Sequence, residues 1–215
     1  MQKVVRFLML AAMLLPFASQ AQTPCATLNL PFFETFDSTS TTRSCWTIID
    51  ADSDSFCWTT LYNGADIGIM LSFSYDNSYG ALNPDNWLIS PKLHTVAGDS
   101  LTMQWTVGAG NDTWYAEHYG VYVSTTTTDT SAFTLVNEWT LTGADEEVKV
   151  LDLSAYAGQD IYVAFRHFNC TDEFALLIDD VRVYAGSYVP DTLNVTFAVN
   201  DATLGTTNPA PGTYQ

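Results

Sequence analysis

Lysine and arginine are scarce in this chain of 215 residues, which has 7 of them against 24 aspartates and glutamates and a formal net charge of −17. Binding to the phosphates of nucleic acids or to anionic membranes requires clusters of basic side chains, so this balance argues against both kinds of partner. The excess of carboxylates suits divalent cations or simple solubility in water instead.

The sequence also lacks the short motifs of common enzymes and zinc sites. It has no GxSxG nucleophile motif, no CxxC pair and no zinc-like spacing of cysteines and histidines. Of the three histidines, His167 shares a strand face with Val163 and Phe165, which predicts a buried structural histidine. The paired carboxylates of a glycoside hydrolase are the best enzymatic alternative, but no paired-Glu strand motif occurs. We therefore predict that the chain is not an enzyme.

The one long apolar run lies at the N-terminus. Lys3 and Arg6 precede an apolar run over residues 7–17, and small residues follow just before Gln22. This pattern predicts a signal peptide at residues 1–21 and an exported protein that is secreted or held at the cell surface. The run is shorter than the ~20 residues of a membrane span, so an uncleaved anchor is the alternative and direct membrane insertion is not expected.

Four cysteines remain after this segment, and export permits disulfides. Four cysteines allow three pairings. Cys25 and Cys45 flank the first predicted strand, so we expect them to form a bridge. Cys57 and Cys170 either pair with each other or stay as buried thiols.

Helix signals are nearly absent, whereas β-branched and aromatic residues alternate with polar ones between turn residues. The pattern predicts strands at residues 30–36, 46–49, 58–60, 87–89, 100–107, 119–124, 135–140, 147–153, 161–169 and 175–184. About ten short strands without helices indicate an all-β fold, an antiparallel jelly-roll β-sandwich over residues 22–187. Residues 188–215 are predicted to be a linker and the start of a truncated second β domain, and therefore part of a longer parent protein.

Two adjacent carboxylates, Asp179 and Asp180, interrupt the apolar strand ALLIDDVRVY. A charge among Leu, Ile and Val needs a partner that neutralises it. Strict alternation along the strand turns Asp179 toward the core with Leu177 and Val181, and turns Asp180 outward.

The first predicted strand offers a partner for Asp179. In LPFFETF, alternation turns Glu34 inward between two phenylalanines. The first and last strands of a sandwich are often neighbours, so we expect Glu34 and Asp179 to share a cation. An oxygen-only ligand set favours Ca²⁺ over zinc or copper. The alternative is that Asp179 accepts backbone N–H bonds or pairs with Arg166 or Arg182.

Two further groups of residues are candidates for binding. Asp50, Asp52 and Asp54 alternate in a turn and can surround one calcium ion, although the Gly and distal Glu of an EF-hand are missing and solvated acidic turns are common. Aromatic side chains in loops can stack on sugar rings, and their alternative role is packing in the core or loops. These are Trp58, Tyr62, Tyr75, Tyr79 and Trp114.

Five segments in order resemble the cleaved adhesin domain found in gingipains and related haemagglutinins. They span residues 30–184 and read LPFFETFDS, WTIIDADSDSFCW, NPDNWLISPKL, YAEHYGVYVSTT and YVAFRHFNCTDEFALLIDDVRVY. The string YVAFRHFNCTD is the most particular to the family. The segment DTLNVTFAVNDATLGTTNPAPGTY also resembles the one that follows such domains in multi-domain adhesins.

The resemblance implies a jelly-roll sandwich that binds structural calcium. It also implies a non-catalytic adhesin module of a surface or secreted protein. The partners that it implies are host or other extracellular proteins, haem or cell-surface ligands. Ser53 and Ser55 stand where family members often have glycine. By position, the acidic motifs of the family fall on Glu34, Asp37, Asp50, Asp52, Asp54, Asp179 and Asp180. A glycan-binding module of a larger secreted enzyme and a structural spacer are the alternative functions.

Overall fold

The computed structural model describes residues 25–64, 66–98, 100–186, 195–197 and 212–214. Strands dominate these residues, and the helical segments are single turns of 3-10 helix: η1 (Arg43–Cys45), η2 (Thr130–Ala132) and η3 (Ser154–Tyr156). None of the helices in this part of the chain is long and apolar enough to cross a membrane. The predicted all-β class is confirmed.

The first sheet has seven strands in the order β1–β9–β14–β11–β12, with β8 against β14 and β3 against β8. The pairing of β1 with β9 is parallel and the other pairings of this sheet are antiparallel. The strands are β1 (Leu28–Asn29), β3 (Thr47–Asp50), β8 (Asn86–Ile89), β9 (Leu93–His94), β11 (His118–Ser124), β12 (Thr134–Thr140) and β14 (Asp160–His167).

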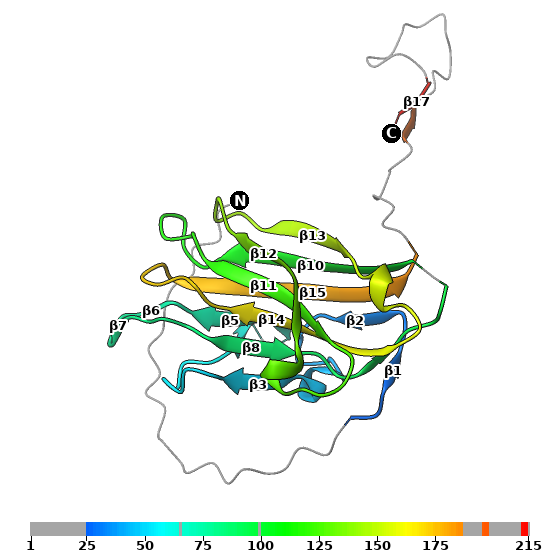
Figure 1. The fold of residues 1–215 in the computed structure, drawn as a ribbon. Coiled ribbons are helices and arrows are strands. Elements are labelled where there is room, and N and C mark those ends of the chain that lie inside the picture. Colours follow the sequence, from blue (N-terminus) through cyan, green and yellow to red (C-terminus); the bar gives the residue numbers. More distant parts are fainter. Residues whose placement is uncertain (1–24, 65, 99, 187–194, 198–211, 215) are drawn as a thin grey trace, which may run out of the picture.

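The second sheet has six antiparallel strands in the order β13–β10–β15–β5–β4, with β2 also paired with β15. Its strands are β2 (Phe32–Glu34), β4 (Thr59–Asn63), β5 (Ile67–Phe73), β10 (Leu101–Ala109), β13 (Glu147–Asp152) and β15 (Ala175–Ala185). Two small hairpins complete the strands: β6 (Tyr75–Asp76) with β7 (Gly80–Ala81), and β16 (Val195–Phe197) with β17 (Gly212–Tyr214). The two large sheets stack as the predicted β-sandwich (Figure 1).

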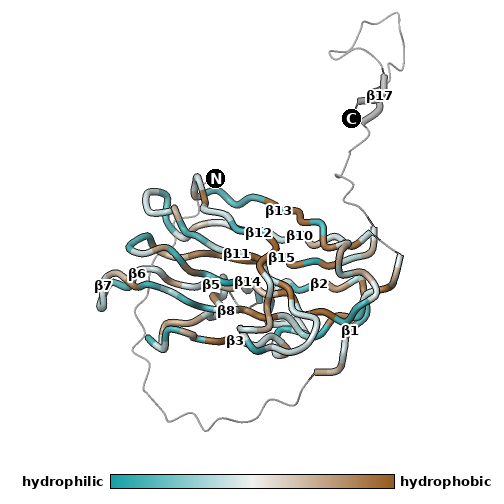
Figure 2. The backbone as a smooth tube through the Cα atoms, in the orientation of Figure 1, coloured by the Kyte–Doolittle hydropathy of each residue, from teal (hydrophilic) through white to brown (hydrophobic). Residues whose placement is uncertain are grey.

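The core lies between the sheets, where apolar residues follow the central strands β10, β11, β14 and β15 while the loops are hydrophilic (Figure 2). Trp105 of β10 is fully buried, and its ring centroid lies 5.4 Å from that of Trp139 and 5.6 Å from that of Phe165. Its indole N–H donates a hydrogen bond of 3.3 Å to the hydroxyl of Tyr119. A strand of the second sheet thus inserts its largest side chain between strands of the first.

Each of the ten predicted strands overlaps a strand of the structure, but the prediction missed β5 and the two-residue strands β1, β6, β7 and β9. The sequence of β5, IGIMLSF, shows no clear alternation and contains Gly68, both of which weaken a strand signal. The glycine is required by a close backbone approach, because a Cβ atom at position 68 would lie 2.1 Å from the carbonyl oxygen of Phe36.

The cysteines divide into one bridge and two thiols. A disulfide joins Cys25 to Cys45 and ties the segment before β1 to η1. Cys57 and Cys170 are free, so the alternative of a second bridge is wrong. The predicted signal peptide and nearly all of the predicted linker and second domain lie outside the described residues.

Candidate functional site

Glu34 lies where the alternation predicted it, fully buried on the inner face of β2. The first predicted strand also lies beside the last one, as expected, because β2 pairs with β15. The carboxylate of Glu34 accepts three hydrogen bonds, which stabilise it within the protein. The donors are the backbone N–H of Phe36 (2.8 Å), the hydroxyl of Thr42 (2.7 Å) and the indole N–H of Trp46 (3.2 Å).

The inward position predicted for Asp179 is wrong, because β15 contains a bulge. The register with β10 shifts between Gln104 and Thr106, so that Asp180 and Val181 together oppose one residue of β10. Asp180 adopts the left-handed conformation with φ +50°, which suits such a bulge. The extra residue turns Val181 into the core and leaves Asp179 half-buried on the outer face. Glu34 is opposite Val181 and faces the core, whereas Asp179 lies on the outer face, so the expected Glu34–Asp179 pair on neighbouring strands does not form.

On the outer face, Asp179 is affected by the charge of a different carboxylate, that of Asp37. Strand β5 pairs with β15 before Asp179, β2 pairs with it after Asp180, and Asp37 follows β2 in sequence. Its carboxylate accepts a hydrogen bond of 2.9 Å from the backbone N–H of Gly68 at the start of β5. Burial raises the pKa of Asp179 to about 7, and the charges of Asp180, Asp37 and Glu146 add to the shift. We call Asp37, Asp179 and Asp180 the seam cluster.

A second acidic group is the predicted turn after β3, where Asp50, Asp52 and Asp54 bring carboxylate oxygens within 4.8 Å of one another. Asp50 accepts backbone N–H bonds from Ser53 (2.8 Å) and Ser55 (2.9 Å), and both serines have positive φ values, as glycine would. Burial raises the pKa of Asp52 to about 6, and its hydrogen bond with Asp50 and the charges of its neighbours add to the shift. The turn is thus folded around its three carboxylates.

The predicted aromatic ligand residues do not form one surface. Trp58 is 1% exposed and its indole N–H donates to the backbone oxygen of Asn86, so its assignment as a binding residue is wrong. Tyr62 is exposed under the guanidinium of Arg43, and Tyr79 is exposed with an edge contact to Phe56.

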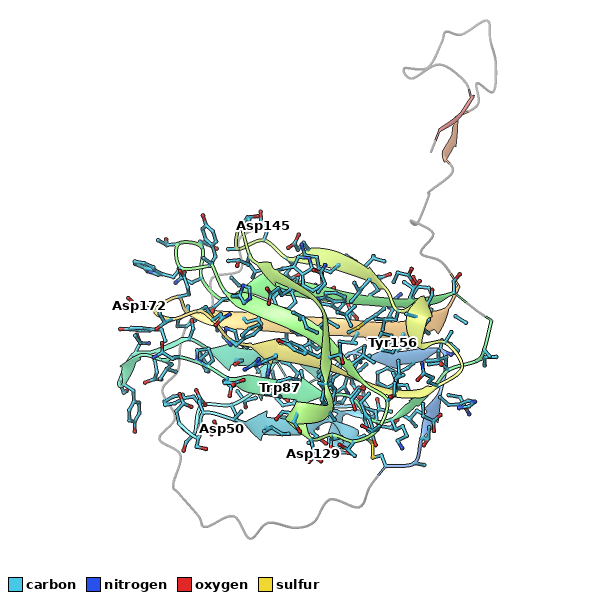
Figure 3. All side chains as sticks on the ribbon, in the orientation of Figure 1. Asp50, Trp87, Asp129, Asp145, Tyr156 and Asp172 are labelled. Carbon is cyan, nitrogen blue, oxygen red and sulfur yellow. A yellow bond between two sulfur atoms is a disulfide. The ribbon has the colours of Figure 1, made fainter. Side chains whose placement is uncertain are left out.

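Tyr75 and Trp114, in contrast, line the same pocket, which has a volume of about 460 Å³. Trp114 is 54% exposed, and its loop is held by Asn111, whose side-chain oxygen accepts the backbone N–H groups of Thr113 (2.8 Å) and Trp114 (3.0 Å). The remaining lining residues are Asn77, Asn111, Asp172, Glu173 and Phe174. Asp172 and Asp50 both lie toward the end of the sandwich that carries β6 and β7, and Tyr156 lies toward the opposite end (Figure 3).

The arginines considered as partners of Asp179 have other roles. Arg166 binds Asp85 through two hydrogen bonds of 2.7 Å, and its guanidinium lies over the rings of Trp87 and Phe168. Arg182 lies over the exposed ring of Phe33 on β2.

Sequence reasoning missed a buried polar network around His167. The histidine is fully buried, as predicted, and its Nδ1 atom lies 2.8 Å from the hydroxyl of Ser72. Its Nε2 atom lies 2.9 Å from a carboxylate oxygen of buried Glu117 and 3.0 Å from the sulfur of Cys170. Burial and the Glu117 charge raise the pKa of the Cys170 thiol well above its usual range. The spacing HxxC was the available signal, but Glu117 lies 50 residues before His167.

This network is not a nucleophilic triad. In a triad, the acid orients the histidine through one ring nitrogen while the nucleophile uses the other. Here Glu117 and Cys170 share Nε2, and a thiol with a raised pKa is a poor nucleophile.

Comparison with known proteins identifies the family. The sequence profile of the Cleaved Adhesin Domain matches residues 29–183. Hemagglutinin A of Porphyromonas gingivalis is 35% identical over 216 residues, covering 84% of this chain and 10% of the relative. A Lys-gingipain of the same species is 35% identical over 167 residues, covering 66% of this chain and 9% of the relative. The chain thus spans about a tenth of the length of these curated relatives.

A solved structure agrees with the fold. One crystal structure of a cleaved adhesin domain of Lys-gingipain from Porphyromonas gingivalis superposes with a TM-score of 0.62 at 31% identity, covering 73% of this chain and 98% of that domain. The two-sheet architecture, the ordered motifs and the profile match over most of the chain lead to the same conclusion. This chain belongs to the cleaved adhesin domain family.

Proposed function

We propose that this domain is a calcium-stabilised, non-catalytic adhesion module of a longer exported protein. Its membership of an adhesin family supports the adhesive role, and the relatives it matches are much longer than this chain. The observation that carries the calcium part of the proposal is the seam cluster, where the charges of Asp37 and Asp180 act on the half-buried carboxylate of Asp179.

The chemistry of both acidic groups fits calcium. Ca²⁺ takes six to eight oxygen ligands at about 2.3–2.6 Å and tolerates irregular geometry. Asp37, Asp179 and Asp180 would hold one ion at the junction of β2, β5 and β15, where it would neutralise carboxylates that otherwise repel one another. Asp50, Asp52 and Asp54 would hold a second ion, and their folded turn already points their oxygens together.

Glu34 has a supporting role in this proposal. Three hydrogen bonds from inside the sandwich already use most of the acceptor positions of its carboxylate. One donor is the backbone N–H of Phe36, a residue with φ +52° that directly precedes Asp37. Glu34 thereby fixes the turn that presents Asp37 to the bulge.

Calcium removal tests this part of the proposal. An ion that binds only the folded protein stabilises it, so chelation with EDTA should lower the melting temperature. Asp179→Ala should remove the part of the calcium-dependent shift that comes from the ion at the seam cluster, whereas Asp129→Ala, in the exposed loop between β11 and β12, should retain the whole shift. A melting curve that chelation leaves unchanged would contradict the assignment of calcium.

The Tyr75–Trp114 pocket is the part of the domain best suited to bind a ligand. It places an exposed indole beside the side-chain amides of Asn77 and Asn111, and Asp172 adds a carboxylate. Aromatic faces stack on the apolar faces of sugar rings, and amides and carboxylates bond to sugar hydroxyls. Glycan recognition is therefore a specific second candidate beside adhesion to proteins or haem.

A comparison of ligand classes separates these functions. Binding of wild type and Trp114→Ala should be measured on a glycan array, on immobilised matrix proteins, and with haem by absorption titration. Glycan signals that disappear in the variant would support sugar recognition in the pocket. Protein or haem binding without glycan signals would support a conventional adhesin, and binding to none of the three would indicate a structural spacer.

A further inference from the structure

Three ligand atoms of different chemistry converge at the end of β14, outside both acidic groups. They are a carboxylate oxygen of Glu117, Nε2 of His167 and the sulfur of Cys170, and all three lie within 4.8 Å of one another. Glu117 and His167 are fully buried, and Cys170 is partly buried. We propose that these three side chains form a binding site for a transition-metal ion of the zinc class.

The backbone brings the ligands together from two neighbouring strands. His167 ends β14 and is opposite Tyr119 of β11, and Glu117 directly precedes that strand. After His167 the chain turns through Asn169, which has φ +54°, so that Cys170 folds back toward the histidine ring. Glu117 and Cys170 thus approach the same ring nitrogen.

One proton on Nε2 of His167 can serve only one of the two neighbours of that nitrogen. Nε2 can donate one N–H bond or accept one, yet it lies 2.9 Å from Glu117 and 3.0 Å from Cys170. The sulfur also contacts the carboxylate of Glu117, and it lies 3.9 Å from the backbone oxygen of His118. A metal ion between the three atoms would bind all of them at once.

The surroundings orient the ligands as outer-shell groups do in metal sites. The hydroxyl oxygen of Ser72 lies 2.8 Å from Nδ1 of His167 and can accept a hydrogen bond from Nδ1–H, a tautomer that leaves the lone pair of Nε2 for the metal. The hydroxyl of Ser74 (2.8 Å) and the backbone N–H of Phe174 (2.9 Å) both donate to Oε1 of Glu117. The other oxygen, Oε2, faces His167 and is available as a ligand.

The donor set selects the metal class. Sulfur and imidazole ligands favour zinc over calcium or magnesium, and a carboxylate completes sets of this kind. Zinc bonds of about 2.0–2.3 Å place neighbouring ligands about 3.2–3.7 Å apart, so the donors must separate by a few tenths of an ångström around the ion. Cys170 also lines a pocket of about 330 Å³, which provides an entry path and room for a water molecule as fourth ligand.

Metal titration of the purified domain tests the site. In buffer with excess calcium, which occupies sites built from oxygen alone, the wild-type domain should bind one zinc ion. Co²⁺ in place of zinc should give a thiolate-to-cobalt charge-transfer band, which requires a sulfur ligand. The absence of this band in wild type would overturn the proposal without reference to any variant.

The two free cysteines provide a matched pair of variants. Cys170→Ser should lose the charge-transfer band and weaken zinc binding by more than about 100-fold, since changes to outer-shell groups alone cost about 10–100-fold. Cys57→Ser should keep both the band and the affinity. Equal zinc affinity in the two variants, or loss of the band in Cys57→Ser only, would overturn the assignment. Neither result depends on whether the domain binds calcium or an adhesion ligand.

Discussion

Replacing Asp179 with asparagine should change the stability of the domain in opposite directions with and without calcium. Asp179 is half-buried on β15, and burial together with neighbouring carboxylates raises its pKa to about 7. Asparagine has nearly the same shape and keeps the oxygen that accepts the backbone N–H of Asp180 at 2.7 Å. The substitution therefore removes the charge with little change in packing.

The magnitude follows from the difference in pKa between the folded and unfolded chains. An aspartate with a pKa of about 3.9 in the unfolded chain and about 7 in the folded chain would, when ionised, lower the free energy of unfolding by about 4 kcal/mol. Because Asp179 is only half-buried, solvent screening reduces this to about 1–2 kcal/mol. Because the pKa of Asp179 is raised in the folded state, the domain has its full stability below about pH 4. It loses about 1–2 kcal/mol as the pH rises to about 7 and Asp179 ionises. Without calcium, the asparagine variant should therefore be the more stable protein above pH 7.

Calcium should make wild type more stable than Asp179→Asn. An ion present at about 100 times its dissociation constant stabilises the folded state by about 2.7 kcal/mol. Dissociation constants near 10⁻⁴ M are common in extracellular modules, so about 10 mM calcium is sufficient. Wild type should gain this stability from the ion at the seam cluster. Asp179→Asn should lose most of that gain and keep the gain from the ion proposed at the Asp50 turn.

Urea denaturation at pH 5 and pH 8, in EDTA and in calcium, measures both effects. Asp129→Asn is the matched control, because Asp129 lies in an exposed loop, and it should behave as wild type in all four conditions. An asparagine variant that is less stable than wild type in EDTA at pH 8 would refute the reasoning from the buried charge. Equal calcium responses of wild type and Asp179→Asn would refute the placement of the ion.

Three further substitutions test the interior by urea denaturation. Glu34→Gln should lower the free energy of unfolding by about 2–4 kcal/mol, because an amide nitrogen cannot accept the hydrogen bonds that the buried carboxylate receives. The surface control Glu138→Gln should change it by less than about 0.5 kcal/mol. Trp105→Ala should cost about 3–5 kcal/mol through the cavity left between the sheets, and a smaller cost would show that the core collapses around it. Arg166→Lys should cost about 1–3 kcal/mol, because lysine cannot form both bonds to Asp85, and an unchanged midpoint would show that the pair contributes nothing.

Much of the fold was predictable because its signals are local. Alternation of apolar and polar residues located the long strands, and the same rule turned Glu34 and His167 into the core. β5 was missed because its sequence is apolar on both faces and contains a glycine whose purpose is a contact with Phe36, 32 positions earlier in the chain. Tertiary contact, rather than local propensity, places the residues of that strand.

The candidate binding sites also divide into those with local sequence signals and those that depend on tertiary contacts. The sequence by itself determined the all-β class, the family and the three carboxylates of the Asp50 turn, because their signals lie within short segments of the chain. It named five aromatic candidates, and the tertiary structure decided that Tyr75 and Trp114 line one pocket. Only the tertiary structure decided that a bulge moves Asp179 from the core to Asp37, and that Trp58 is buried. A bulge depends on the register with a neighbouring strand, and burial depends on which segments cover a side chain. The meeting of Glu117, His167 and Cys170 likewise requires two strands to lie side by side, and no spacing within one segment encodes that contact.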